Sequence, residues 1–146
     1  MLKLDSDDVA RPRLVDRLAE AIAADPDVDV LGTQMAMFGD WQEVTRHPER
    51  VTRRRVIGDH RFWFVNHTGV LLDREAVLAS GGYRALRGLP EDYDLWIRMM
   101  RRGYHRFRNL PDVLVDYRVL PTGMHATMRK YAARFLLLRQ KYSLLL

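Results

Sequence analysis

The pattern of apolar and polar positions divides the first part of the chain into alternating strands and helices. Residues 2–4 form the end of an apolar strand, and residues 13–24 carry apolar side chains at every fourth position, the spacing of an amphipathic helix. A β-rich run follows at 28–37, whereas residues 40–61 are polar and predict a surface excursion with at most a short helix. This alternation predicts an α/β fold.

The second half of the chain continues with shorter elements. Residues 69–72 form a short apolar strand, and the next helix begins at Asp73. It ends at Gly81 and Gly82, because glycine suits the left-handed conformation that commonly terminates a helix. We therefore expect a strand–helix unit over this segment.

The helix predicted at 90–102 has the clearest signals. Its acidic residues gather in the first turn and its basic residues in the last turn, which complements the helix dipole, and Gly103 closes it. At helical spacing, four apolar side chains are expected to form its buried stripe: Tyr93, Trp96, Met99 and Met100.

The last part of the chain is predicted to contain two short strands, around Phe107 and over 113–119, and a final helix over 126–146. Residues 117–146 hold no Asp or Glu, so this amphipathic helix is basic. It could lie on an anionic membrane, or its apolar stripe could pack against the sheet or a second subunit. We expect a catalytic unit over 1–120 and this helix over 121–146.

Length and composition narrow the class of protein. A chain of 146 residues has room for one domain with a real core. The absence of Cys excludes a disulfide framework and thiol catalysis, and fits a reducing compartment. With no signal-peptide pattern and no apolar run near the roughly 18 residues of a membrane span, the expected location is cytoplasmic, with membrane association through the C-terminal helix as an option. The net charge of +5 suits anionic partners.

A first candidate site is the acidic turn that follows the opening strand. Asp5, Asp7 and Asp8 place several carboxylates within a few ångströms, where a cation would relieve their repulsion. Hard oxygen ligands of this kind suit Mg²⁺ or Mn²⁺. The competing interpretation is an N-cap and acidic first turn for the following helix.

A second candidate site lies on the first turn of the 90–102 helix. Glu91 and Asp92 are adjacent carboxylates held beside fixed backbone donors. The helix dipole favours the ionised form, so a carboxylate here would act as a base at neutral pH. The alternative is that both residues only complement the dipole.

Taken together, five segments resemble the family 2 glycosyltransferases in order and spacing. The resemblance covers about residues 1–120 and corresponds to the C-terminal half of the catalytic domain. It implies a GT-A fold, a mixed sheet flanked by helices, and transfer of a sugar from a nucleotide diphosphate donor to an acceptor hydroxyl with inversion. The segments that carry it are 4–8, 66–77, 81–84, 91–98 and 109–119.

The resemblance also implies roles for single residues. Asp5 would lie near the ribose or the metal shell, and Asp7 would coordinate the Mn²⁺ or Mg²⁺ that bridges the donor diphosphate. Asp92 would be the general base, and Glu91 would orient the acceptor or support Asp92. His67 would lie on the acceptor side. The implied partners are a nucleotide-sugar donor and a carbohydrate, lipid or protein acceptor, with no nucleic acid.

Two features depart from the family pattern. The Pro-x-Tyr-Asn-like stretch and the Asp-Asp-Gly-Ser turn that bind the nucleotide are absent, so we expect the first nucleotide-binding strands to be missing and this chain to be inactive if nothing replaces them. The histidine that commonly follows the family's Tyr-Arg pair is also displaced. His125 and Arg118 are the candidates for contact with phosphate or metal.

Other classes of function compete with this interpretation. The segment 5–9 also fits the first motif of haloacid-dehalogenase-type phosphatases, in which an Asp attacks phosphate. That class needs a later Gly-Asp-x-x-x-Asp motif, and Trp63 stands where its second Asp should be. Two further alternatives are a basic binding module around the arginines at 53–55 and a non-catalytic remnant. No nucleic-acid motif accompanies those arginines.

Overall fold

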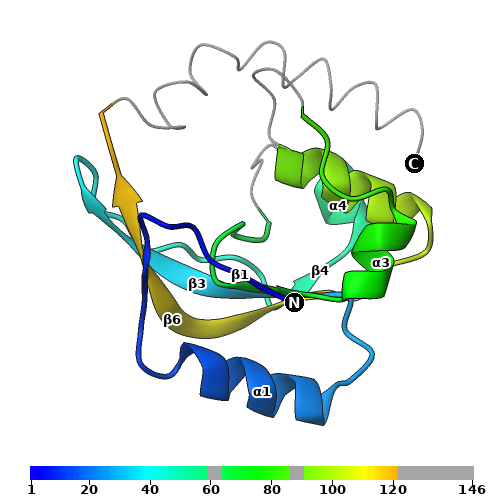
Figure 1. Ribbon diagram of the computed structural model, residues 1–146, viewed down its shortest axis with the longest axis horizontal. Coiled ribbons are helices and arrows are strands. Elements are labelled where there is room, and N and C mark those ends of the chain that lie inside the picture. The colour runs from blue at the N-terminus through cyan, green and yellow to red at the C-terminus, as the bar shows by residue number, and fades with distance from the viewer. Residues whose placement is uncertain (59–63, 86–90, 122–146) are drawn as a thin grey trace.

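A curved sheet of six strands forms the centre of the molecule, with helices on both of its faces (Figure 1). The computed structural model describes residues 1–58, 64–85 and 91–121. The predicted α/β class with a mixed sheet flanked by helices is confirmed. In chain order the elements are β1 (Leu2–Lys3), β2 (Val9–Ala10), α1 (Leu14–Ala24), β3 (Val30–Gly39), β4 (Arg50–Val51), α2 (Arg53–Gly58), β5 (Val70–Leu72), α3 (Arg74–Ala79), α4 (Glu91–Arg101) and β6 (Phe107–Val119).

The sheet is built around one parallel pair of long strands. Its order is β1-β5-β3-β6-β2, and β4 also pairs with β6. The strands β3 and β6 run parallel, and the other pairings are antiparallel. The short β1 and β2 lie at opposite ends of this order, and the acidic turn connects them.

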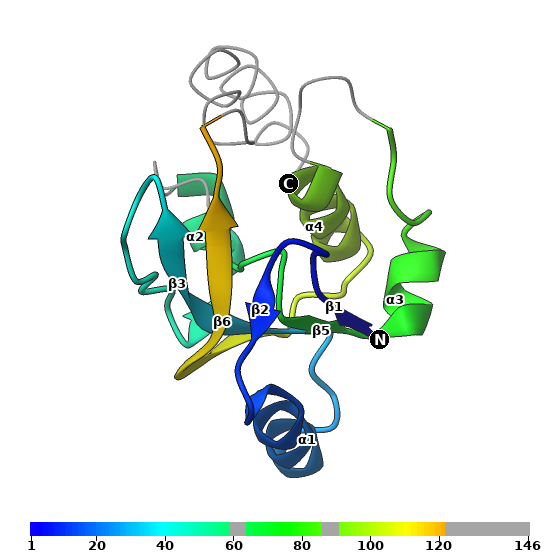
Figure 2. The ribbon, with the colours of Figure 1, turned by 60° about the vertical axis from the view of Figure 1, so that its left-hand side comes forward.

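Alternation along the central strands creates two hydrophobic cores. Val30 of β3 packs in one core with residues of α3 and α4, and its neighbour Leu31 packs in the other with Leu14 and Leu18 of α1. Successive side chains of a strand point to opposite faces, so adjacent residues enter different cores. Helix α1 covers one face, and α3 and α4 cover the other (Figures 1 and 2).

The prediction of two separate strands around Phe107 and over 113–119 was wrong, because β6 is one strand of 13 residues. Pro111 interrupts the pattern in the sequence but not the strand. Between Asn109 and Val113 the strand bulges, since β3 advances only from Gly32 to Gln34 over the same stretch. A proline lacks a backbone N–H and is tolerated at such a bulge.

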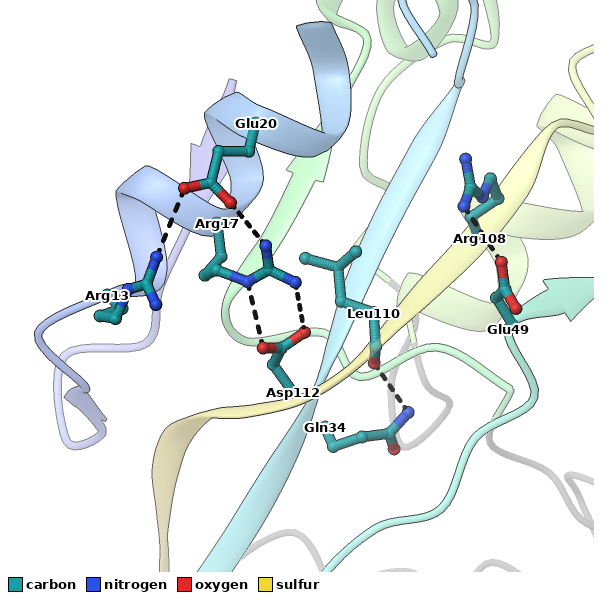
Figure 3. Close-up of polar contacts among 8 residues, drawn as sticks. All are labelled: Arg13, Arg17, Glu20, Gln34, Glu49, Arg108, Leu110 and Asp112. Carbon is teal, nitrogen blue, oxygen red and sulfur yellow. Dashed lines mark hydrogen bonds and ion pairs between the residues drawn. The ribbon is translucent and has the colours of Figure 1, made fainter. Parts of the chain in front are cut away.

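Polar side chains from both sides hold this bulge in place (Figure 3). The Nε2 of Gln34 donates to the carbonyl oxygen of Leu110 at 3.1 Å. From α1, Arg17 binds Asp112 through two parallel bonds, Nε to Oδ1 at 3.1 Å and Nη2 to Oδ2 at 3.0 Å. The Gln34 contact satisfies a backbone carbonyl at the bulge, and the Arg17–Asp112 pair connects α1 to it.

The predicted surface excursion over 40–61 is more ordered than its polar composition indicated. It contains β4 and α2, and a buried polar network ties it to β3. The Oε1 of Gln34 accepts from the backbone N–H of His47 at 2.8 Å and from the hydroxyl of Thr45 at 3.1 Å. The Nε2 of His47 lies 2.7 Å from Oδ1 of Asn66. This network anchors the segment just before His67.

The two helices on the site side begin and end where the sequence predicted. Asp73 caps α3, its Oδ1 accepting from the backbone N–H of Glu75 at 2.8 Å, and Gly81 and Gly82 follow with φ of 82° and 61°. The predicted single buried stripe of α4 was too narrow. The whole run from Asp92 to Met100 is buried, and it includes the ion pair of Asp94 with Arg98.

Several predictions lie outside the described residues. The C-terminal helix over 126–146, the unit over 121–146 beyond its first residue, and His125 belong to this group. The helices of the described segments are all too short or too polar to traverse a lipid bilayer.

Candidate active site

The acidic turn connects β1 to β2 at the edge of the sheet. The backbone N–H of Asp8 donates to the carbonyl oxygen of Asp5 at 3.2 Å, which closes the turn. The backbone N–H of Asp5 donates to the hydroxyl of Thr68 at 3.3 Å. The turn is therefore fixed against the segment that carries His67. The prediction that it caps the following helix is not met, because β2 intervenes before α1.

The three carboxylates of the turn differ in their surroundings. Asp5 is half-buried and forms an ion pair with Lys3, whereas Asp7 is exposed. The carboxylate of Asp8 accepts from the backbone N–H of Arg118 at 2.9 Å. Burial raises the pKa of Asp8 above its ordinary value, and the neighbouring Asp7 and Asp5 add to this rise. The turn thus concentrates negative charge at a partly desolvated place.

Asp92 is buried at the first turn of α4, with only 8% of its surface exposed. Its Oδ1 accepts from the backbone N–H of Tyr93 at 2.8 Å. Burial raises its pKa to about 6, and the adjacent Glu91 contributes to the rise. The expectation that the dipole would favour ionisation is corrected here, because desolvation outweighs the backbone donors. At pH 7 the ionised form still predominates.

The structure brings the two candidate sites together. Tyr117, on β6, interacts electrostatically with both sites. Burial makes the largest contribution to its raised pKa, and the turn carboxylates and Asp92 raise it further. Lys3 acts in the opposite direction and lowers the pKa of Asp92. Electrostatic coupling of this kind falls off with distance, so the acidic turn and the first turn of α4 both lie within electrostatic reach of Tyr117.

His67 lies within electrostatic reach of Asp5 and packs edge-on against Trp96 of α4. Its Nε2 is 3.0 Å from the hydroxyl oxygen of Tyr83, and the two rings are stacked at a tilt with 5.3 Å between their centroids. Burial lowers its pKa to about 4, and the nearby Lys3 lowers it further while Asp5 opposes the shift. His67 is therefore neutral at physiological pH.

Arg118 borders the acidic turn from β6. Its Nε donates to the carbonyl oxygen of Asp7 at 3.2 Å, and its guanidinium carbon lies 4.8 Å from the centre of the Phe38 ring. The side chain is exposed, so its cation is available to an anion at the turn. The predicted candidate Arg118 is thus placed at the site, and its companion His125 falls outside the described residues.

The donor atoms at the acidic turn supply only part of the coordination shell that a resident metal ion needs. Within the described segments, no three His, Cys, Asp or Glu side chains gather into a metal-binding group. The oxygens of Asp5 and Asp7 are hard donors, and Mg²⁺ binds through one or two carboxylates when phosphates and water supply the rest of its shell. The turn therefore fits a cation that arrives with a diphosphate, and it does not form a metal cage.

Sequence reasoning missed some residues that line this site. Lys3 and Tyr83 were not singled out, although Lys3 directly precedes the acidic turn and Tyr83 follows the Gly-Gly pair. Tyr117 was noted in the sequence only as the residue before Arg118 in the Tyr-Arg pair. Their proximity to Asp92 depends on sheet pairing between distant segments, and no local pattern carries that information.

The chain is similar in sequence to known glycosyltransferases. The chain matches the family model described as glycosyl transferase family group 2 over residues 1–144. It is 31% identical over 151 residues to an uncharacterized glycosyltransferase of Haemophilus influenzae, covering 99% of this chain and 54% of that relative. It is 29% identical over 122 residues to the amylovoran biosynthesis glycosyltransferase AmsE of Erwinia amylovora, covering 80% of this chain and 43% of that relative.

The chain spans about half the length of the curated relatives it matches. The match nevertheless extends over nearly the whole chain and includes both candidate sites. It decides against the haloacid-dehalogenase alternative, which is a different class of protein. The chain belongs to glycosyl transferase family group 2.

Proposed function

We propose that this chain carries the metal-binding and acceptor-activating part of an inverting glycosyltransferase that uses a nucleotide-sugar donor. The observation that supports this most directly is the position of Tyr117. The negative charges of Asp92 and of all three carboxylates of the acidic turn raise the pKa of its hydroxyl. A base and a diphosphate-binding turn must face one space if a sugar is to pass between them. The acceptor is a carbohydrate, lipid or protein hydroxyl.

In this proposal Asp92 is the general base. Its Oδ1 is held by the backbone N–H of Tyr93, so the other carboxylate oxygen receives the proton of the acceptor hydroxyl. As that proton leaves, the acceptor oxygen forms a bond to the anomeric carbon, and the bond from that carbon to the diphosphate breaks on the opposite face. A pKa near 6 suits this task, because the base is ionised at neutral pH and still able to hold a proton.

The remaining residues hold the reactants. Asp7 and Asp5 would hold Mn²⁺ or Mg²⁺, which when bound supplies positive charge for the departing diphosphate. Arg118 presents its guanidinium beside Asp7 and would contact a phosphate oxygen. Glu91 lies next to Asp92 and keeps the pKa of that carboxyl raised. His67, being neutral, would offer a hydrogen bond on the acceptor side without repelling the cation.

Thermal unfolding with and without Mn²⁺ plus UDP or GDP tests the donor side of the proposal. A ligand that binds only the folded state raises stability by about 2.7 kcal/mol at a concentration of one hundred times its Kd. We expect the melting temperature of the wild type to rise with Mn²⁺ plus nucleotide and that of Asp7→Asn to respond much less. Asp16→Asn, which removes an exposed carboxylate from α1, is the matched control and should respond like the wild type. Equal responses of wild type and Asp7→Asn would place the cation elsewhere.

A further inference from the structure

Four aromatic rings form a continuous row from the core to the candidate active site. Phe107 of β6 lies edge-on to Trp96 of α4 with 5.7 Å between centroids, and Trp96 lies edge-on to His67 at 6.2 Å. His67 in turn stacks against Tyr83 at 5.3 Å. The first two rings are fully buried, and Tyr83 at the end of the row is 40% exposed. The last ring therefore presents the largest surface of the four to a ligand.

A buried cation holds the turn that precedes the exposed ring. Arg98 of α4 donates through Nη1 to the carbonyl oxygen of Ser80 and through Nη2 to that of Gly82 at 2.7 Å. Its Nε also donates to Oδ2 of Asp94 at 2.8 Å, so the buried charge is paired. The carbonyls it binds belong to the turn that follows α3. The turn that precedes Tyr83 is thus fastened to the helix that carries Asp92.

Tyr83 also lies within the electrostatic reach of the catalytic carboxylates. Burial raises the pKa of its hydroxyl, and Asp92, Glu91 and Asp5 raise it further. The phenol is therefore neutral at physiological pH. Its hydroxyl is bonded to His67, and the remaining ring surface is open. An exposed aromatic side chain is ordinary by itself, but one whose hydroxyl is bonded to His67 within electrostatic reach of Asp92 is not.

From these contacts we infer that Tyr83 binds the acceptor, and that the acceptor is a pyranoside whose C–H face packs on the Tyr83 ring. The axial hydrogens of a pyranose form an apolar patch that matches an aromatic face, while the hydroxyls at its edge reach the neighbouring polar groups. Packing on Tyr83 places one such hydroxyl toward Asp92. Tyr83 thereby selects for a sugar acceptor over a bare lipid or a protein side chain. This inference rests on the proposed function of Asp92 as the base.

Saturation-transfer NMR on the chain tests the inference without requiring turnover. The probes are methyl β-D-glucopyranoside, methyl β-D-galactopyranoside and N-acetyl-D-glucosamine. We expect transfer to the C–H protons of at least one probe in the wild type and in Tyr83→Phe, which keeps the ring. In Tyr83→Ala the affinity should fall about fivefold or more, the scale of one aromatic contact. Leu78→Ala, which removes another exposed apolar side chain from the same helix–turn unit, should match the wild type.

The two sides of the site can fail separately. Asp7→Asn should lose the response of its melting temperature to Mn²⁺ plus UDP or GDP and keep the sugar signal, whereas Tyr83→Ala should show the reverse. Absence of transfer to any probe in the wild type would overturn the acceptor inference and leave the donor site intact. Equal signals from the wild type and Tyr83→Ala would overturn it as well.

Discussion

At the scale of single residues, Asp92 is the group whose surroundings matter most. The fold buries a carboxylate, and backbone N–H groups, among them that of Tyr93, compensate its charge only in part. Its pKa of about 6 results from this incomplete compensation. A fully solvated Asp would be ionised but too weak a base, and a fully buried one without donors would stay protonated. The intermediate environment suits proton abstraction at neutral pH.

We predict that Asp92→Asn lowers transferase turnover by a factor of about 10² to 10⁴, the usual contribution of a positioned base. The amide keeps the shape and the bond from Tyr93 and loses the basicity. Turnover is measured as nucleoside diphosphate released from a nucleotide-sugar in the presence of an acceptor. Near wild-type turnover of the variant would leave Asp92 as a residue that only complements the helix dipole.

The pH profile of the same reaction provides an independent check. Turnover should rise with pH through the pKa of about 6 and reach a plateau above it. The groups that surround Asp92 are Glu91 on its own helix, Lys3 on β1, Tyr83 after α3 and Tyr117 on β6. Because Glu91 raises the pKa of Asp92, Glu91→Gln should move the rising limb to lower pH. A limb that stays in place would mean that another group limits the rate.

Site residues that belong to a short sequence motif could be predicted from the sequence. Asp5, Asp7 and Asp92 were singled out from short motifs and His67 from the family resemblance, and their roles stay predictions. The sign of the Asp92 pKa shift was not predictable. A first-turn position indicates a favourable dipole, but the burial that overrides it comes from the packing of α4 against distant segments.

At the scale of elements, β6 shows what local patterns miss. Pro111 marks a strand boundary in the sequence, yet the strand continues because β3 offers Gln34 at the bulge. That compensation requires the two strands to be paired in a particular register. Helix α3 is the opposite case, since Asp73 and the glycines at its end determine its limits locally.

We predict that Gln34→Ala destabilises the protein by about 2–4 kcal/mol, the range for breaking a buried hydrogen-bonded network. Gln34 is only 5% exposed, and its loss leaves the Leu110 carbonyl and the backbone N–H of His47 without these partners. Urea denaturation measures the change. Gln42→Ala, at an exposed position on the same excursion, is the control and should change the stability by less than about 0.5 kcal/mol. Similar midpoints for both variants would show that the network contributes little.

At the scale of the whole molecule, the site lies where the two halves of the described fold meet. The acidic turn belongs to the N-terminal part, which packs α1 on one face of the sheet, and Asp92 belongs to the helical layer on the other face (Figure 2). Sheet pairing between β1 and β5, and between β2 and β6, brings them together. The class of fold followed from the alternation of elements, whereas the strand order required contacts that only the folded chain reveals.

The last prediction concerns the stability of the whole fold as a function of pH. The native pKa of Asp92 is raised from 3.8 to about 6, so between these values the folded state binds more protons than the unfolded state. The stability that this difference supplies is fully present below pH 3.8 and is lost as pH rises through 6. The shift corresponds to about 2–3 kcal/mol.

Asp92→Asn lacks this loss because an amide does not ionise. The free energy of unfolding of the wild type, measured in urea from pH 4 to pH 7.5, should therefore fall by that amount relative to Asp92→Asn. Asp16→Asn should follow the wild type, because Asp16 is exposed on α1. A constant difference between the wild type and Asp92→Asn across this range would mean that the carboxylate is solvated as well as it is in the unfolded chain, and it would remove the physical basis for its role as a tuned base.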